Sequence, residues 1–199
     1  FELARSRRLK IATDLLDEIH SHMDSVSSEA FRTPEASRVF MKILSGPGAV
    51  ATTLGAMHRA HLLEKLIPVF ATLRGLMQFN QYHKYTVDEH TLLAVGKAEA
   101  LALEPGVMGV VYQEIRRKDL LHLAILLHDL GKGRKEDHCE VGKAIAEETS
   151  ARLGFDLQET RTLMFLVHRH LLMSHTAFRR DPYDENVLVP FAQEVVTPE

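Results

Sequence analysis

The segment between Leu120 and Leu127 is apolar almost all the way round. It reads LLHLAILL, and seven of its eight residues are apolar. Apolar side chains on every face of a helix indicate a helix that is buried on all sides. No stretch of useful length alternates between apolar and polar residues as a half-buried strand does. We therefore expect an all-α fold in which other helices surround this one.

Helical spacing of apolar residues recurs along most of the 199-residue chain, a length that suits one domain with a smaller appendage. Thr86 and Glu89 have the spacing of a capping box, and Pro68 breaks or kinks the segment 61–79. The other predicted helices cover residues 3–23, 34–45, 48–57, 87–104, 107–117, 141–153, 157–173 and 185–195. We expect a helical region over residues 1–80 to pack on a second region over residues 81–199.

The composition excludes several classes of protein. Lys and Arg number 24 against 27 Asp and Glu, a formal charge of −3, so no basic field favours nucleic acid. The longest apolar runs are far too short to span a membrane. Cys139 is the single cysteine, which rules out an internal disulfide and fits a reducing compartment. We expect a cytoplasmic protein with no nucleic-acid partner and no membrane partner.

His128 and Asp129 follow the apolar segment directly, and Gly131 is expected to cap that helix in the left-handed conformation. A carboxylate at a buried helix end is costly to desolvate, and a divalent cation bound by this nitrogen and these oxygens would offset the cost. Each further histidine, taken alone, is most simply a core residue with a hydrogen-bond partner, and only the joint pattern favours a metal site. The candidates for the remaining ligands are His83, His90, His138, His168, His170, His175 and Asp181.

The pattern of these residues resembles the HD domain, a helical family of metal-dependent phosphohydrolases. His90, the His128–Asp129 pair and Asp181 match its H…HD…D signature. Longer strings resemble the central region of bacterial PII uridylyltransferase/uridylyl-removing enzymes, namely YHKYTVDEHTL, LLHDLGKGRKEDHCEVG, LVHRHLLMSHTAFRRD and AMHRAHLLEKLIPVFATLRGLMQF. The resemblance covers nearly the whole chain. It implies an all-α HD-domain helical bundle over residues 81–199 with an N-terminal helical extension.

The resemblance also implies a set of ligands and a chemistry. Asp129 would bridge two ions, one held with His90, His128 and Asp181 and the other with His138 and His170. The cofactor would be one or two divalent ions, Mn²⁺ or Mg²⁺, with Fe, Co or Zn as alternatives. Water bound to such an ion ionises near neutral pH, which favours hydrolysis of a phosphodiester. The expected catalytic residues are Asp129, Lys132 and His83, and the expected phosphate-binding residues are Lys132, Arg134 and Arg180.

The same resemblance implies a substrate and partners. In these enzymes the HD domain removes UMP from a uridylylated tyrosine of the PII nitrogen-signalling protein. The full enzymes also have a nucleotidyltransferase domain and glutamine-sensing ACT domains, neither of which has a recognisable pattern here. We therefore expect this chain to remove UMP but not add it, and to do so without a response to glutamine.

Two other classes of function stay open at this point. One is an HD hydrolase that acts on a free nucleotide or a cyclic dinucleotide. The other is a non-catalytic sensor that keeps the helical frame and binds a ligand. Cys139 is interpreted as a small buried residue at a helix start rather than as a nucleophile, because a reactive thiolate needs a paired base and a lowered pKa. A zinc site of His138 and Cys139 is an open alternative, although the chain has no second cysteine to complete it.

Overall fold

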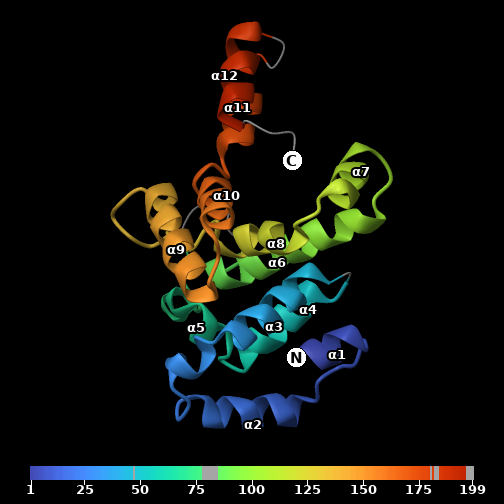
Figure 1. Cartoon of the computed structure of the whole chain (residues 1–199), viewed down its shortest axis with the longest axis vertical. Helices are drawn as coiled ribbons and strands as arrows, with labels where there is room; N and C mark the ends of the chain where they lie inside the picture. The colour runs from blue at the N-terminus through green and yellow to red at the C-terminus, as the bar shows by residue number, and fades with distance from the viewer. Residues whose placement is uncertain (47, 78–84, 180, 182–183, 196–199) are drawn as a thin grey trace.

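Every regular element that the structure describes is a helix, as the sequence predicts. The computed structural model describes residues 1–46, 48–77, 85–179, 181 and 184–195 (Figure 1). None of its helices is long and apolar enough to cross a membrane. The elements are α1 (Glu2–Ser6), α2 (Thr13–Met23), η1 (Ser28–Phe31), α3 (Pro34–Ser45), α4 (Val50–Arg59), α5 (Leu63–Leu66), η2 (Pro68–Leu73), α6 (Val87–Ala100), η3 (Leu101–Leu103), α7 (Val107–Glu114), α8 (Lys118–Leu127), α9 (His138–Leu153), α10 (Leu157–His168), α11 (Leu172–Arg179) and α12 (Glu185–Val195).

Helix α8 is the central helix of the core. It packs against α3, α6, α9 and α10 (Figure 1). Leu123, Leu126 and Leu127 have no exposed surface, and burying each such side chain contributes roughly 1.5–3 kcal/mol. The prediction of a buried helix is confirmed for most of the segment, but Leu121 and Ile125 are partly exposed, so α8 is not buried on every side. The packing of α8 fixes the position of the residues that follow it.

His122 is the polar exception on α8. Its Nδ1 donates to the carbonyl oxygen of Leu44 on α3 at 2.6 Å, and the hydroxyl of Tyr112 on α7 donates to its Nε2 at 3.0 Å. The neutral imidazole satisfies both contacts, and burial lowers the pKa of His122 below its ordinary value. This residue joins three helices and is a core histidine rather than a candidate ligand.

We expect His122 to make the fold sensitive to mild acid. Because its folded-state pKa is depressed, the unfolded chain binds the proton first, and stability present above about pH 6.5 is lost as the pH falls below it. The free energy of unfolding, measured in urea, should therefore fall between about pH 7.5 and about pH 5. His122→Gln keeps a donor and an acceptor but does not titrate, so its stability should fall less steeply. Equal slopes in the two proteins would contradict this account.

Residues on both sides of position 87 share one hydrophobic core. Phe40 and Leu44 on α3 and Leu54 on α4 belong to the same buried cluster as Leu123 on α8 and Val167 on α10. Helix α3 packs on α8, and helix α4 packs on α6. The N-terminal helices therefore form part of the wall of this core.

Glu99 on α6 adds a polar link between the same two parts of the chain. Helix α4 starts after Ala49, which has a left-handed φ of 61° and no side chain that could cap the helix. The two carboxylate oxygens of Glu99 instead accept from the backbone N–H of Val50 at 2.9 Å and of Ala51 at 3.1 Å. A carboxylate at a helix N-terminus satisfies amides that have no partner within the helix and complements the helix dipole.

The prediction of a single helix over residues 3–23 is wrong. Helix α1 ends at Ser6, α2 begins at Thr13, and Arg8 between them has a left-handed φ of 54°. Arg5 is buried and donates to the carbonyl oxygen of Lys42 on α3 at 3.2 Å. A continuous helix would place the cations Arg5 and Arg8 one turn apart, and the tertiary contact of Arg5 favours the break.

Two further predictions of local structure are wrong. Residues 157–173 do not form one helix, because α10 ends at His168 and α11 begins at Leu172. Thr86 is the N-cap residue of α6, but its side chain makes no capping hydrogen bond, so the predicted capping box is not formed. A capping box is present at the start of α10, between Asp156 and Glu159.

Helices α11 and α12 extend away from the other helices (Figure 1). Helix α12 has no buried residue. Burial of apolar surface against the core therefore contributes little to holding α12 in place.

Candidate metal centre

His128 and Asp129 stand where α8 ends. His128 is the C-cap residue of this helix, and Asp129 follows it with only 3% of its surface exposed. Since helices cover α8 on several sides, its C-terminal end lies inside the molecule. The carboxylate of Asp129 is therefore held in the interior by the packing of the apolar segment that precedes it.

Gly131 does not have the left-handed conformation that the sequence analysis predicts. The positive φ in this loop belongs to Gly133, at 83°. Gly131 is needed for space instead, because a Cβ on it would lie 2.1 Å from the carbonyl oxygen of His138 and 3.0 Å from the backbone nitrogen of Gly142. The missing side chain lets the residues after α8 approach the first turns of α9 closely.

The first group of candidate ligands contains His90, His128 and Asp129. One ligand atom from each residue lies within 4.8 Å of the other two. The Nε2 atoms of His90 and His128 lie 3.4 and 3.2 Å from Asp129 Oδ2. Lys132 Nζ lies 2.7 Å from the same oxygen. His90 comes from the first turn of α6, and its side chain is 40% exposed, so the group is open to solvent on that side.

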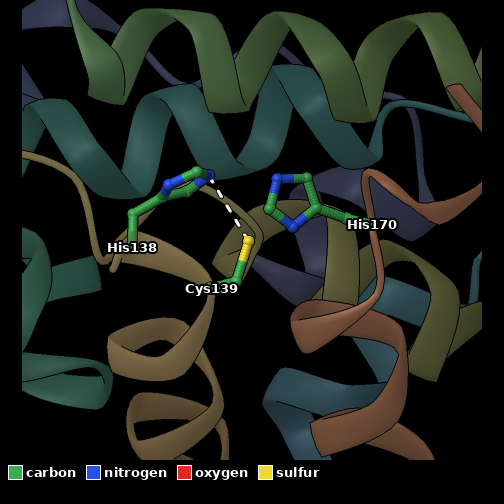
Figure 2. A group of neighbouring side chains, drawn as sticks. All are labelled: His138, Cys139 and His170. Carbon is green, nitrogen blue, oxygen red and sulfur yellow. Dashed lines mark hydrogen bonds between the residues drawn. The ribbon is translucent and has the colours of Figure 1, made fainter. Parts of the chain in front are cut away.

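The second group contains His138, Cys139 and His170 (Figure 2). His138 and Cys139 are the first two residues of α9, which begins three residues before the predicted position. The Asp137 carboxylate caps this turn by accepting from the backbone N–H of Cys139 at 2.9 Å. The sulfur of Cys139 lies 3.6 Å from His138 Nε2, and Figure 2 shows it between the two imidazole rings.

Asp129 links the two groups. Its Oδ2 faces His90 and His128, while its Oδ1 lies 3.9 Å from Nε2 of His170. The ring centroids of His128 and His170 are 5.2 Å apart. One buried carboxylate thus presents one oxygen to each group.

Backbone carbonyl groups fix the orientation of two of the imidazoles. Nδ1 of His128 donates to the carbonyl oxygen of Ile125 at 2.6 Å, and Nδ1 of His170 donates to that of Val167 at 2.8 Å. Because a carbonyl oxygen can only accept, Nδ1 carries a proton in both rings. Nε2 is then the atom that faces Asp129, where it can bind either a second proton or a metal ion.

The charges of the site suit a divalent cation. Burial opposes ionisation of Asp129, but hydrogen bonding and positive charge from His128 and Lys132 hold its pKa below the ordinary value. Burial and the neighbouring His128 lower the pKa of His170. An ionised carboxylate among imidazoles is a donor set that fits Mn, Fe, Co or Zn.

The thiol of Cys139 is a poor nucleophile in this setting. Burial and the carboxylates of Asp137 and Asp129 raise the pKa of Cys139 above its ordinary value. A protonated thiol does not attack an electrophile efficiently. This environment agrees with the interpretation from sequence that Cys139 is not a nucleophile.

Several predicted residues do not join either group. Asp181 is exposed, lies between α11 and α12, and is not among the clustered ligands of the described residues. Arg134 is exposed in the loop after α8. His83 and Arg180 lie outside the residues that the structure describes. The roles given to these four residues stay predictions.

His168 is directed elsewhere, and Cys139 is the neighbour that the sequence analysis left out of the ligand set. Nε2 of His168 lies 2.8 Å from Glu140 Oε1, a hydrogen bond that links α10 to α9. Cys139 could have been found from its position next to His138 at a helix start. Two adjacent side chains in a first turn can reach the same point, because no earlier turn lies in their way.

An all-helical core that gathers two histidine-rich groups around one buried aspartate defines a helical metal-binding domain. Residues 87–195 match the family model of the HD domain. The match covers more than half of the chain, and the chain belongs to the HD domain family.

The chain is also similar to proteins named bifunctional uridylyltransferase/uridylyl-removing enzyme. The enzyme of Pasteurella multocida (strain Pm70) is 36% identical to this chain over 201 residues. The aligned region covers 98% of this chain and 23% of the relative. The enzyme of Methylococcus capsulatus is 41% identical over 193 residues, and the aligned region covers 94% of this chain and 22% of the relative. The chain thus spans about a fifth of the length of these curated relatives. The resemblance to this group of enzymes is confirmed.

Proposed function

We propose that this domain hydrolyses a phosphodiester with the help of one or two divalent metal ions. The observation that carries the proposal is the position of Asp129, with one carboxylate oxygen facing His90 and His128 and the other facing His170. A carboxylate shared in this way is suited to hold two ions side by side. Metal sites of this kind hydrolyse phosphate esters in several classes of enzyme.

We propose that the substrate is the UMP group on a uridylylated tyrosine of the PII signalling protein. The support is the similarity to uridylyl-removing enzymes along 94–98% of the chain. The domain would then act in the cytoplasm as the central part of a longer protein. Its partners would be uridylylated PII and the nucleotidyltransferase and ACT domains of the same protein.

In this proposal each of the two groups of ligands binds one ion. His90, His128 and Asp129 would hold the first ion, and Asp181, which lies outside this group between α11 and α12, would complete its set if that segment moved toward α6. His138 and His170 help to hold the second. A divalent ion in this place supplies a nucleophile at neutral pH and positive charge for the phosphate. Of the two ions expected from the sequence, Mn²⁺ suits the first group better than Mg²⁺, because two of its three ligands are imidazole nitrogens.

Lys132 is proposed to bind the phosphate of the substrate. Its ammonium lies 2.7 Å from Asp129 Oδ2. A divalent cation on that carboxylate would repel the ammonium, whose flexible stem then lets it turn to a phosphate oxygen. Arg134 and Arg180 are proposed as further phosphate-binding residues, and His83 as a proton donor to the leaving oxygen.

Release of UMP from uridylylated PII tests the proposal. With Mn²⁺ present, the domain should act on uridylylated PII with a kcat/KM at least about tenfold above that for free nucleotides or cyclic dinucleotides. A preference for a free or cyclic nucleotide would reject PII as the substrate. No hydrolysis with Mn²⁺, Mg²⁺, Fe²⁺, Co²⁺ or Zn²⁺ would reject catalysis and favour a non-catalytic sensor.

A further inference from the structure

We propose that Cys139 is a direct ligand of a thiophilic divalent ion, Zn²⁺ in particular, held together with His138 and His170. The proposal rests on the proposed function in that it concerns the second group of ligands in the same centre. It goes beyond that function by giving the second group a different metal preference from the first.

The distances already approach those of a zinc site. Tetrahedral zinc with Zn–S of about 2.3 Å and Zn–N of about 2.0–2.1 Å separates a sulfur and a nitrogen ligand by about 3.6 Å. Cys139 Sγ lies 3.6 Å from His138 Nε2. The ligand atoms of all three residues lie within 4.8 Å of one another, so a small movement of the His170 ring would bring the third nitrogen within range.

The three side chains lie next to one another, with one ligand atom of each within 4.8 Å of the other two. His170 has its Nδ1 tied to the carbonyl oxygen of Val167, which leaves its Nε2 for the ion. His138 turns its Nε2 toward the sulfur of Cys139, and the sulfur lies between the two rings (Figure 2). When a metal–sulfur bond forms, the thiol proton leaves to solvent. The resulting thiolate lies in the first turn of α9, at the positive end of the helix dipole.

The two groups therefore differ in chemical softness. The first group offers two imidazoles and an oxygen of Asp129, which suits Mn²⁺ as well as Zn²⁺. The second group offers two imidazoles and a sulfur beside Oδ1 of Asp129. Thiolate ligands select zinc, cobalt or cadmium over manganese and magnesium. A centre of this composition is suited to hold two different metals at once.

Titration of the metal-free protein with Co²⁺ tests this ligand directly. A thiolate bound to Co²⁺ gives a sulfur-to-metal charge-transfer band in the near ultraviolet, which imidazole and carboxylate ligands do not give. The wild type should show this band. Cys139→Ser should lose it, and should bind Zn²⁺ about 10–100-fold more weakly while its Mn²⁺ affinity changes less than about threefold.

His90→Ala is the matched control, because it removes a ligand of the first group only. It should keep the charge-transfer band and lose affinity for Mn²⁺. Circular dichroism should show the same helix content in all three proteins. Absence of the band from the wild type, or unchanged Zn²⁺ affinity in Cys139→Ser, would overturn the proposal.

These measurements contain no substrate, so they separate the two proposals. A charge-transfer band that depends on Cys139 would support the ligand even if uridylylated PII were not hydrolysed. Hydrolysis of uridylylated PII by a protein without such a band would leave the proposed function standing and reject Cys139 as a ligand.

Discussion

Replacing Asp129 with alanine is expected to reduce phosphodiester hydrolysis by at least about 100-fold while leaving the helices formed. Residues that merely orient a metal ligand cost about 10–100-fold when they are removed, and Asp129 faces both groups of ligands itself. No other carboxylate of the described residues belongs to either group. The fold should survive, because the change removes a buried charge and Lys132, with its side chain 16% exposed, can turn to solvent.

Hydrolysis of bis(p-nitrophenyl) phosphate with Mn²⁺ and release of UMP from uridylylated PII are the two readouts. Asp129→Asn keeps the shape of the side chain and should lose activity to a similar degree, since the charge is what binds the ion. Asp156→Asn is the control, because asparagine still caps α10 and the residue lies outside the site. Activity of Asp129→Ala within about tenfold of the wild type would show that the site is wrongly assigned.

Gly131→Ala is expected to harm both stability and activity. Its Cβ would lie 2.1 Å from the carbonyl oxygen of His138, and this backbone atom can give way only if the start of α9 shifts as a whole, which costs more than turning the end of a flexible side chain. Overpacking of this kind costs about 1–3 kcal/mol of the free energy of unfolding. The clash would also push the start of α9 away from Asp129, and a displacement of about 1 Å in a site can cost about 100-fold in rate.

Urea unfolding and hydrolysis with Mn²⁺ measure the two effects. Gly55→Ala on α4 is the matched control, since a Cβ there would meet nothing within 4 Å. Alanine is favoured over glycine inside a helix, so this variant should be more stable by up to about 1 kcal/mol and equally active. If Gly131→Ala has the same free energy of unfolding as the wild type, the close approach of the loop after α8 to α9 does not require glycine at this position.

Periodicity and charge were enough to predict the part of the centre that depends on one segment. The apolar run from Leu120 to Leu127 predicts a buried helix, and in the structure six of its eight residues are buried. A histidine and an aspartate directly after such a helix must then lie in the interior. The inference works because burial of α8 is decided by its own residues.

The features that depend on a second, distant segment could not be predicted in the same way. A side chain at position 131 would clash with the backbone of α9. No local sequence pattern shows how closely that backbone approaches. Arg5 in the short helix α1 donates to a carbonyl group on α3, a contact that its own periodicity does not show. Cys139 joins a ligand group only because α10 brings His170 to it. Each of these depends on how helices meet, which is decided by the whole core.

The match to the HD family model begins at residue 87, but the hydrophobic core also contains residues of α3 and α4, which come earlier in the chain. A gene fragment trimmed to that stretch would encode α6 and α8 without the helices that carry Leu44 and Leu54, and would leave apolar surface in water. Glu99 would lose the amides of α4 that it satisfies. The match to the family model and the hydrophobic core thus have different boundaries in this protein, and a fragment made for expression should keep the helices that complete the core.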